Sequence, residues 1–250
     1  MQPEEYAKMY HLEDTYWWFQ GRLNLVADQL EHLSCLDREG VRVLDLGCGT
    51  GLMLDYLNAR CWSAGLDFSK LALDFSRQRG LKRLLQADVQ ALPVCDHSCD
   101  LVTALDLAEH VEHDDRMFVE IYRILRPGGQ FVLTTPAHPF LWSDHDDALF
   151  HCRRYTREEL RQKLLDAGFQ IERLTYCISF TFPAIVAFRL VQKFYHRLFH
   201  KPERPKTHVI QLPGWANRFL KTTVLFESRL LRHFDLPFGI TLLAVLRKTE

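Results

Sequence analysis

Three glycines at alternate positions, Gly47, Gly49 and Gly51, follow directly on a short apolar run at residues 41–46. Apolar residues at helical spacing begin at once, from Leu52 onward. Glycine accepts positive φ and carries no Cβ, so the backbone of such a turn can approach a ligand closely. In doubly wound sheets, ligands bind outside the carboxyl ends of parallel strands. The sequence therefore predicts a strand, a tight turn facing a ligand site, and a helix. A turn that serves packing alone is the alternative.

The glycine spacing also bears on which ligand the turn suits. In the dinucleotide fingerprint G-x-G-x-x-G, the last glycine would stand where this chain has Leu52, because Gly51 comes one residue early. Asp45, just before the turn, places a carboxylate where it repels phosphates and attracts a cationic ligand. We therefore expect a cationic ligand rather than the pyrophosphate of a nicotinamide dinucleotide.

The run from Val43 to Gly51 resembles motif I of the class I S-adenosylmethionine-dependent methyltransferases, of the broad Methyltransf_11/23 type. The resemblance covers roughly residues 40–176, and its further parts come in the family's order. They are a strand at 61–66 that ends at Asp67, a strand at 82–86 before Asp88, a strand at 100–105 that ends at Asp106, a helix at 117–125, an Arg-Pro-Gly-Gly turn at 126–129 and a strand at 130–135.

The resemblance implies an α/β fold with a Rossmann-like, doubly wound sheet of seven strands. The last two strands, at 170–177 and 240–247, are expected to form an antiparallel pair. It also implies one methyltransferase domain over residues 1–250. Within that domain we expect an N-terminal lid at 1–39, a cofactor-binding core at 40–177, a helical insert at 178–239 and the last strand at 240–250.

The cofactor that the resemblance implies is S-adenosyl-L-methionine. In the family, an acid at the position of Asp67 binds both ribose hydroxyls, and a carboxylate that accepts two O–H bonds suits a vicinal diol. Phe68 is expected to cover the adenine, Asp88 to accept from its amine, and Arg22 to pair with the methionyl carboxylate. The full expected set is Arg22, Asp45, Gly47, Cys48, Gly49, Gly51, Asp67, Phe68, Asp88, Val89, Leu105 and Asp106.

Four consecutive aromatic residues stand at 16–19, followed by Gly21, Arg22 and a helical pattern expected at 23–33. Aromatic side chains at this density seldom stay exposed, because each can bury a large area. We expect this segment to cover the site. Simple packing of Trp17 and Trp18 on the core is the alternative.

The expected insert carries most of the chain's charge asymmetry. Residues 189–234 hold ten Lys or Arg and two acids, a net charge of 10 − 2 = +8, in a chain of net charge −1. Apolar stripes at helical spacing run through 190–199 and 215–234, edged with basic residues such as Lys193, Arg197 and Lys201. The uncharged run at 174–188 is too short for a membrane span, which needs about 20 residues. The two stripes fit a lid or dimer face, or helices lying in a membrane interface.

Composition places the chain among reduced, cytoplasmic proteins. Seven cysteines without a C-x-x-C pair argue against a disulfide framework. The polar N-terminus does not read as a signal peptide. A net charge of −1 gives no sign of a nucleic-acid partner. We expect a cytoplasmic bacterial protein, with peripheral contact at the inner membrane face as an open alternative.

Methyl transfer from a sulfonium mainly requires a nucleophile held in line and water excluded. A hydroxyl acceptor also has to lose a proton, whereas an amine does not need a base. His110, His145 and His151 are the candidate bases, and the segment at 143–156 resembles a substrate-facing pattern of bacterial methyltransferases. No H-x-x-x-H or C-x-x-C spacing supports a metal, so none is expected.

We therefore predict in-line methyl transfer to an O or N atom of a small-molecule, lipid or glycan-linked acceptor. Two alternatives remain open at this point. One is an NAD(P)-dependent reductase, and the other is a non-catalytic protein that binds S-adenosylmethionine as a partner or regulator. The oligomeric state is not predicted.

Overall fold

The computed structural model describes residues 3–33, 36, 39–198 and 212–249. Its centre is a seven-stranded sheet in the order β3-β2-β1-β4-β5-β7-β6, in which β7 runs antiparallel to both neighbours and the other pairs are parallel. The strands are β1 (Arg42–Leu46), β2 (Trp62–Asp67), β3 (Leu84–Gln86), β4 (Cys99–Leu105), β5 (Leu125–Pro136), β6 (Phe169–Cys177) and β7 (Thr241–Lys248). The predicted doubly wound sheet with an antiparallel closing pair is confirmed.

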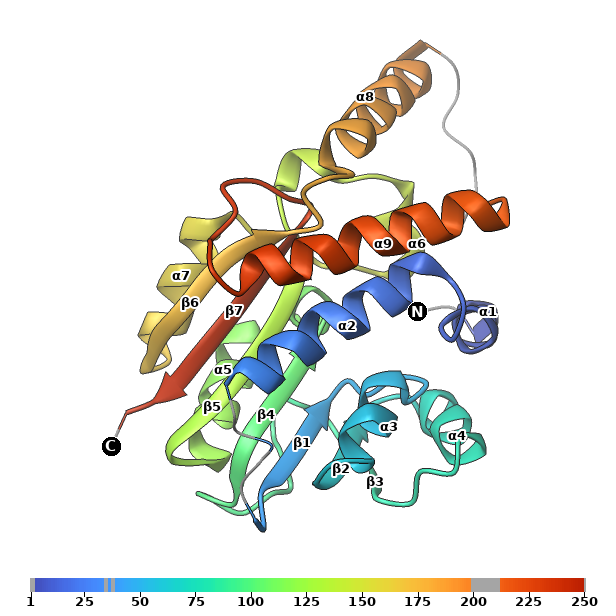
Figure 1. The fold of residues 1–250 in the computed structure, drawn as a ribbon. Coiled ribbons are helices and arrows are strands. Elements are labelled where there is room, and N and C mark those ends of the chain that lie inside the picture. The colour runs from blue at the N-terminus through green and yellow to red at the C-terminus, as the bar shows by residue number, and fades with distance from the viewer. Residues whose placement is uncertain (1–2, 34–35, 37–38, 199–211, 250) are drawn as a thin grey trace.

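Helices cover both faces of the sheet (Figure 1). They are α1 (Pro3–Leu12), α2 (Trp17–His32), α3 (Leu52–Asn58), α4 (Lys70–Gln78), α5 (Asp114–Ile124), α6 (Asp144–Leu149), α7 (Arg157–Asp166), α8 (Phe182–Leu198) and α9 (Gly214–Leu231), with 3₁₀ turns at Ala108–His110 and Pro139–Leu141. One buried cluster joins α5 and α7 to the sheet, and a second joins α2, α3 and α9 to its other face. Central strands buried on both faces explain their near-continuous apolar sequences.

Helix α2 begins earlier than the sequence predicts. Gly21 and Arg22 were expected to precede a helix at 23–33, but the helix already starts at Trp17. The reason is packing against α9, since a Cβ on Gly21 would lie 3.0 Å from Cγ1 of Val224. Glycine costs about 1 kcal/mol in a helix interior. Here its missing side chain lets α2 and α9 lie side by side (Figure 1).

Both α8 and α9 lie in the connection between β6 and β7, where the sequence predicts a helical insert. Glu227 of α9 is fully buried and accepts hydrogen bonds from the backbone N–H groups of Ile178, Ser179 and Phe180, which lead into α8. Figure 1 shows α9 lying along the body of the protein, while α8 projects away from it.

The uncharged run at 174–188 is shared between β6 and the first turns of α8. Among the described residues, no helix has the length and apolar character to cross a membrane. The basic residues Lys201, Arg204 and Lys206 and the apolar Phe199, all counted in the sequence pattern, lie outside the described residues, as does the side chain of Arg197.

Candidate functional site

A cavity of about 940 Å³ opens at the carboxyl ends of the parallel strands. Its wall comes from the glycine turn, the ends of β2 and β4, the N-terminal helices α1 and α2, and residues of α6, α8 and α9. Most sequence-predicted site residues line this cavity, including all three candidate histidines. Gly51 is not part of its wall, although Gly47 and Gly49 are.

The glycine turn between β1 and α3 has the backbone that its sequence predicts. Gly47, Gly49 and Gly51 have φ values of +65°, +56° and +91°. A Cβ on Gly47 would lie 2.8 Å from the side chain of Leu107, and one on Gly51 would lie 2.5 Å from that of Leu81. Both the conformation and the lack of space therefore require glycine here.

Asp67, at the end of β2, connects that strand to the glycine turn. Its two carboxylate oxygens accept from the backbone N–H of Gly49 at 2.9 Å and of Ser69 at 2.8 Å. Burial raises the pKa of Asp67, and these two hydrogen bonds act against the rise. Each oxygen retains a lone pair for a further donor. The side chain is therefore held rigidly and can still accept two hydroxyl hydrogen bonds.

Asp45 and Cys48 line the same wall and also have structural partners. The buried Asp45 accepts from Oγ1 of Thr103 at 2.6 Å, and burial raises its pKa to about 7. Cys48 packs in a small buried cluster with Leu54 and Leu73. The hydrogen bond of Asp45 and the packing of Cys48 hold the glycine turn against the core.

Residues expected near the adenine lie at the open edge of the cavity. Phe68 is 76% exposed, whereas Val89 is buried in the wall. Asp88 accepts from the backbone N–H of Gln90 at 2.9 Å, which fixes the loop around it. Leu105 lines the cavity at the end of β4.

Arg22 reaches the end of β4 from α2. It forms an ion pair with Asp106, which has a φ of +49°, and donates to Oγ1 of Thr134 at 3.3 Å. Burial lowers the pKa of Arg22. The structure thus brings Arg22 and Asp106 together at the cavity wall, two residues that the sequence predicted separately.

The first helix and Glu13, which directly follows it, make contacts that the sequence did not predict. Glu13, nearly fully buried, accepts from Oγ1 of Thr50 at 2.6 Å and forms an ion pair with Arg79. Met9 and Tyr6 line the cavity above the glycine turn. No spacing in the sequence links Glu13 with Arg79, so only the fold could identify this attachment of the N-terminal segment to the glycine turn.

The three candidate histidines meet at one end of the cavity, although they are far apart in the chain. The ring centroids of His110 and His151 are 4.6 Å apart, and those of His145 and His151 are 6.5 Å apart. Burial lowers the pKa of His110 and of His145 to about 3, so both rings are neutral near pH 7.

Asp146 fixes the orientation of His151. It is fully buried in the short helix α6, and its Oδ1 lies 3.0 Å from Nδ1 of His151 and 2.6 Å from Nε of Arg154. Burial acts to raise the pKa of Asp146, but the hydrogen bond from His151 and the charge of Arg154 hold it well below its usual range. The ionised carboxylate therefore favours a proton on Nδ1 and leaves Nε2 of His151 available.

Part of the cavity lining, here named the apolar arm, consists of apolar side chains, although Arg154 and Arg189 also line the cavity. The apolar arm comes from the turn after β5, α6, α8, α9 and the residue two before α9, and comprises Leu141, Leu149, Ala184, Ile185, Phe188, Leu212 and Leu220. Polar residues and an apolar arm in one cavity suit a ligand with a polar reactive group and a long apolar part.

A protein-family model for a methyltransferase domain matches residues 44–133. Over these residues the chain matches the methyltransferase family. Its curated relatives include probable S-adenosylmethionine-dependent methyltransferases of mycobacteria, such as one from Mycolicibacterium smegmatis that is 31% identical over 64% of this chain and 62% of that protein. The match covers β1 to β5, and the glycine turn and Asp67 lie inside it.

Curated relatives and solved structures agree with this family. A fatty-acid O-methyltransferase of Mycolicibacterium smegmatis is 35% identical over 159 residues, which are 60% of this chain and 52% of that protein. Among the first curated relatives, the aligned region spans 52% to 62% of their length.

An S-adenosylmethionine-dependent methyltransferase from Mesorhizobium loti shares the fold with a TM-score of 0.54, at 20% identity over 83% of this chain and 91% of that one. The [4+2]-cyclase SpnF shares it with a TM-score of 0.56, at 22% identity over 90% of this chain and 80% of that one. The fold therefore does not by itself specify the reaction.

We expect Asp67→Ala to weaken binding of S-adenosylmethionine by about 10- to 100-fold, because loss of a charged hydrogen-bonding partner costs about 1.5 to 3 kcal/mol. Isothermal titration calorimetry on the purified variant measures this. Asp74→Ala, which removes an exposed carboxylate from α4, is the matched control and should leave affinity unchanged. Equal affinity in Asp67→Ala and the wild type would remove Asp67 from the cofactor site.

Proposed function

We propose that this protein transfers the methyl group of S-adenosylmethionine to an oxygen atom of an acceptor with a long apolar part. The observation that carries the proposal is that one cavity is lined by the glycine turn and Asp67, by the three histidines and by the apolar arm. A cofactor at the first position and an acceptor in the arm would meet beside the histidines.

The reaction needs little covalent chemistry from the protein. A lone pair of the acceptor oxygen forms the new bond to the methyl carbon while the carbon–sulfur bond breaks, and the sulfonium becomes the neutral thioether of S-adenosylhomocysteine. The acceptor hydroxyl loses its proton. Alignment and exclusion of water supply most of the rate enhancement in such a site.

The buried polar end favours a hydroxyl acceptor over an amine. An amine attacks without a base, so a histidine fixed by a buried carboxylate would have no task in that reaction. Among the candidates His110, His145 and His151, the contacts favour His151, because Asp146 fixes its ring and leaves Nε2 available. Glu109, also fully buried, lines the cavity beside it.

An apolar acceptor also gives α8 and α9 a role as a contact with an anionic lipid surface. Among the residues that the structure describes, ten of the eighteen exposed large apolar side chains lie between residues 180 and 238. They are Phe180, Phe188, Leu190, Val191, Phe194, Trp215, Phe219, Phe226, Phe234 and Phe238. Aromatic and aliphatic side chains beside basic ones are typical of helices that lie in a membrane interface.

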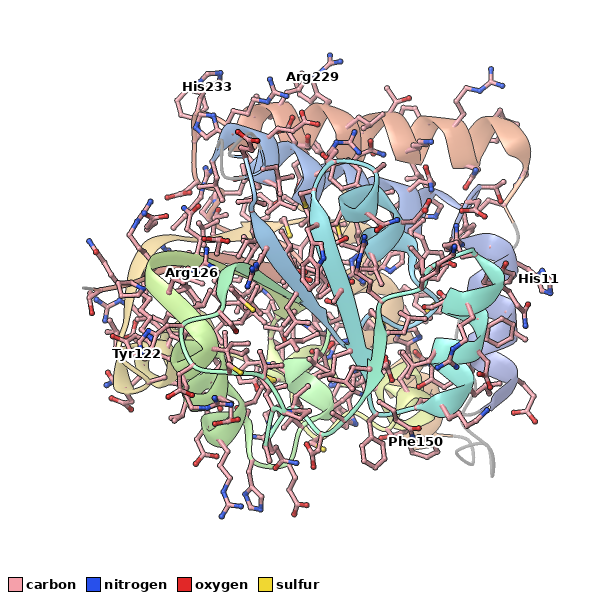
Figure 2. All side chains as sticks on the ribbon, turned by 90° about the horizontal axis from the view of Figure 1, so that it is seen from below. His11, Tyr122, Arg126, Phe150, Arg229 and His233 are labelled. Atoms are coloured by element: carbon pink, nitrogen blue, oxygen red, sulfur yellow. The ribbon has the colours of Figure 1, made fainter. Side chains whose placement is uncertain are left out.

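The charges on these helices complement an anionic surface. Lys193, Arg218 and Arg229 are exposed, and Figure 2 shows Arg229 on the side of α9 that faces away from the sheet. Within the described part of 182–240, the acids are the buried Glu227 and Asp235, which is paired with Arg173. The same α8 lines the apolar arm through Ile185 and Phe188, so a lipid acceptor could pass from the surface to the cavity along one helix. The name of the fatty-acid relative is consistent with such an acceptor.

We expect His151→Ala to lower turnover by about 100-fold or more while leaving cofactor affinity unchanged, since removal of a group that activates the nucleophile typically costs about 10²- to 10⁴-fold. Turnover would be assayed with long-chain hydroxyl or carboxyl acceptors at saturating cofactor, beside His110→Ala and His145→Ala. His32→Ala, on the exposed end of α2, is the control. Near-normal turnover in all three site variants would mean that positioning alone suffices.

We expect the wild-type protein to cosediment with anionic vesicles at low salt and to be released at high salt. Each basic residue near such a surface contributes about 1 kcal/mol, and salt screens it within a Debye length. Val191→Asp, in the exposed face of α8, should abolish binding, whereas Val119→Asp, equally an exposed helical valine on α5, should not. Absence of binding at low salt would contradict the membrane contact and leave α8 as a lid.

A further inference from the structure

Glu109 is a buried carboxylate with an unsatisfied oxygen. The residue is fully buried in the 3₁₀ turn after β4, and its Oε2 accepts from Oγ1 of Thr135 at 3.1 Å. Its Oε1 has no hydrogen-bond partner among the described residues. A buried carboxylate oxygen without a partner is costly unless a cation or a donor meets it.

Two histidines face the same place. A carboxylate oxygen of Glu109 and one ring nitrogen each of His110 and His151 all lie within 4.8 Å of one another. Two ligands of one zinc ion at bond lengths of 2.0 to 2.2 Å can be at most about 4.2 Å apart. In a tetrahedral site the ligand atoms lie about 3.4 Å apart, so the three groups need to approach one another by up to about 1.4 Å to share an ion.

Both histidines are already oriented by a second partner. Nδ1 of His151 lies 3.0 Å from the buried Asp146, and the ring of His110 donates to the backbone carbonyl of Phe150. A metal-bound histidine almost always donates its other ring N–H to a carboxylate or carbonyl, which fixes the free nitrogen toward the ion. The arrangement of His110 and His151 has this form.

We propose that Glu109, His110 and His151 bind one divalent transition-metal ion of the zinc type at the acceptor end of the cavity. Two imidazoles and one carboxylate form a known catalytic zinc set that leaves a coordination position open. Nitrogen ligands disfavour Mg²⁺ and Ca²⁺, which prefer oxygen. No metal was expected because the sequence has no H-x-x-x-H or C-x-x-C spacing. Such spacing cannot indicate this set, because folding brings residues 109, 110 and 151 together from two separate segments.

The catalytic consequence rests on the proposed function, whereas the binding of the ion does not. The open position would take the acceptor oxygen, and a coordinated hydroxyl loses its proton far more readily than a free one. His151 would then act as a ligand of the ion and not as the base, and the proton of the acceptor hydroxyl would pass to water. Methyl transfer itself is unchanged in its balance, since the ion is neither oxidised nor reduced.

The test is a titration of the chelator-stripped full chain with Co²⁺, followed by its absorption spectrum, and with Zn²⁺ by calorimetry. We expect one ion per chain and the visible bands of low-coordinate cobalt, without a thiolate charge-transfer band. Absence of the thiolate band excludes binding at the free cysteines, such as the exposed Cys152. Glu109→Gln and His151→Ala should each weaken binding by about 100-fold or more, and Asp146→Asn, which acts through His151, by about 10- to 100-fold.

His145→Ala is the matched control, because this neighbouring histidine is outside the triad, and it should retain the ion. Circular dichroism and S-adenosylmethionine affinity show whether each variant is folded. The proposal is overturned if the wild type binds neither ion, or if Glu109→Gln and His151→Ala bind as the wild type does. Methyl transfer by the stripped, ion-free protein at the wild-type rate would overturn the catalytic role while leaving the proposed function intact. Absence of methyl transfer by a wild-type protein that binds the ion normally would overturn the proposed function and leave the metal site intact.

Discussion

The hydrogen bond from the backbone N–H of Gly49 to Asp67 holds the site together. It joins the turn after β1 to the end of β2, at 2.9 Å, in a region where the backbone takes three positive φ values within five residues. A side chain at Gly47 or Gly51 would meet Leu107 or Leu81, so this turn conformation, and the hydrogen bond that depends on it, requires glycine. The position of the carboxylate is thus set by backbone geometry, which makes it suitable for recognising a rigid ligand.

The N-terminal helices are attached to the glycine turn by side-chain contacts. Glu13 bonds Thr50 and pairs with Arg79, which ties the N-terminal helices to the turn over the cavity. Helix α2 packs closely against α9 at Gly21. Glu227 of α9 in turn accepts a hydrogen bond from the backbone N–H of Ser179, just before α8. The segments that cover the cavity therefore form one connected path, from the glycine turn to the helix that projects from the body. The N-terminal segment and the α8–α9 connection are joined by these contacts and line the same cavity.

The sequence predicted the sheet well because each strand is short, apolar and followed by a recognisable turn. The bounds of β1, β2, β4, β6 and β7 agree with the expected ranges within one or two residues. The start of β5 was wrong: the strand begins at Leu125, which pairs with Cys99 of β4, so the Arg-Pro-Gly-Gly run expected as a turn at 126–129 lies inside it. Residues at the ends of strands, such as Asp67 and Asp106, were found because parallel strands end at the same edge of the sheet.

Interactions between distant segments could not be predicted in the same way. The pairing of Glu13 with Arg79 has no sequence spacing, and neither has the meeting of Glu109 with His151. The start of α2 was wrong because Gly21 reads as a helix boundary unless its contact with Val224 is known. Local patterns predicted the elements, and tertiary contacts decided which polar groups share a site.

The central claim is that the cavity beside the glycine turn holds S-adenosylmethionine rather than a nicotinamide dinucleotide. The most direct measurement is a pair of calorimetric titrations of the purified chain, one with S-adenosylmethionine and one with NADPH. We predict saturable binding of one S-adenosylmethionine per chain and no heat of binding with NADPH. Binding of NADPH that S-adenosylmethionine cannot displace would contradict the account.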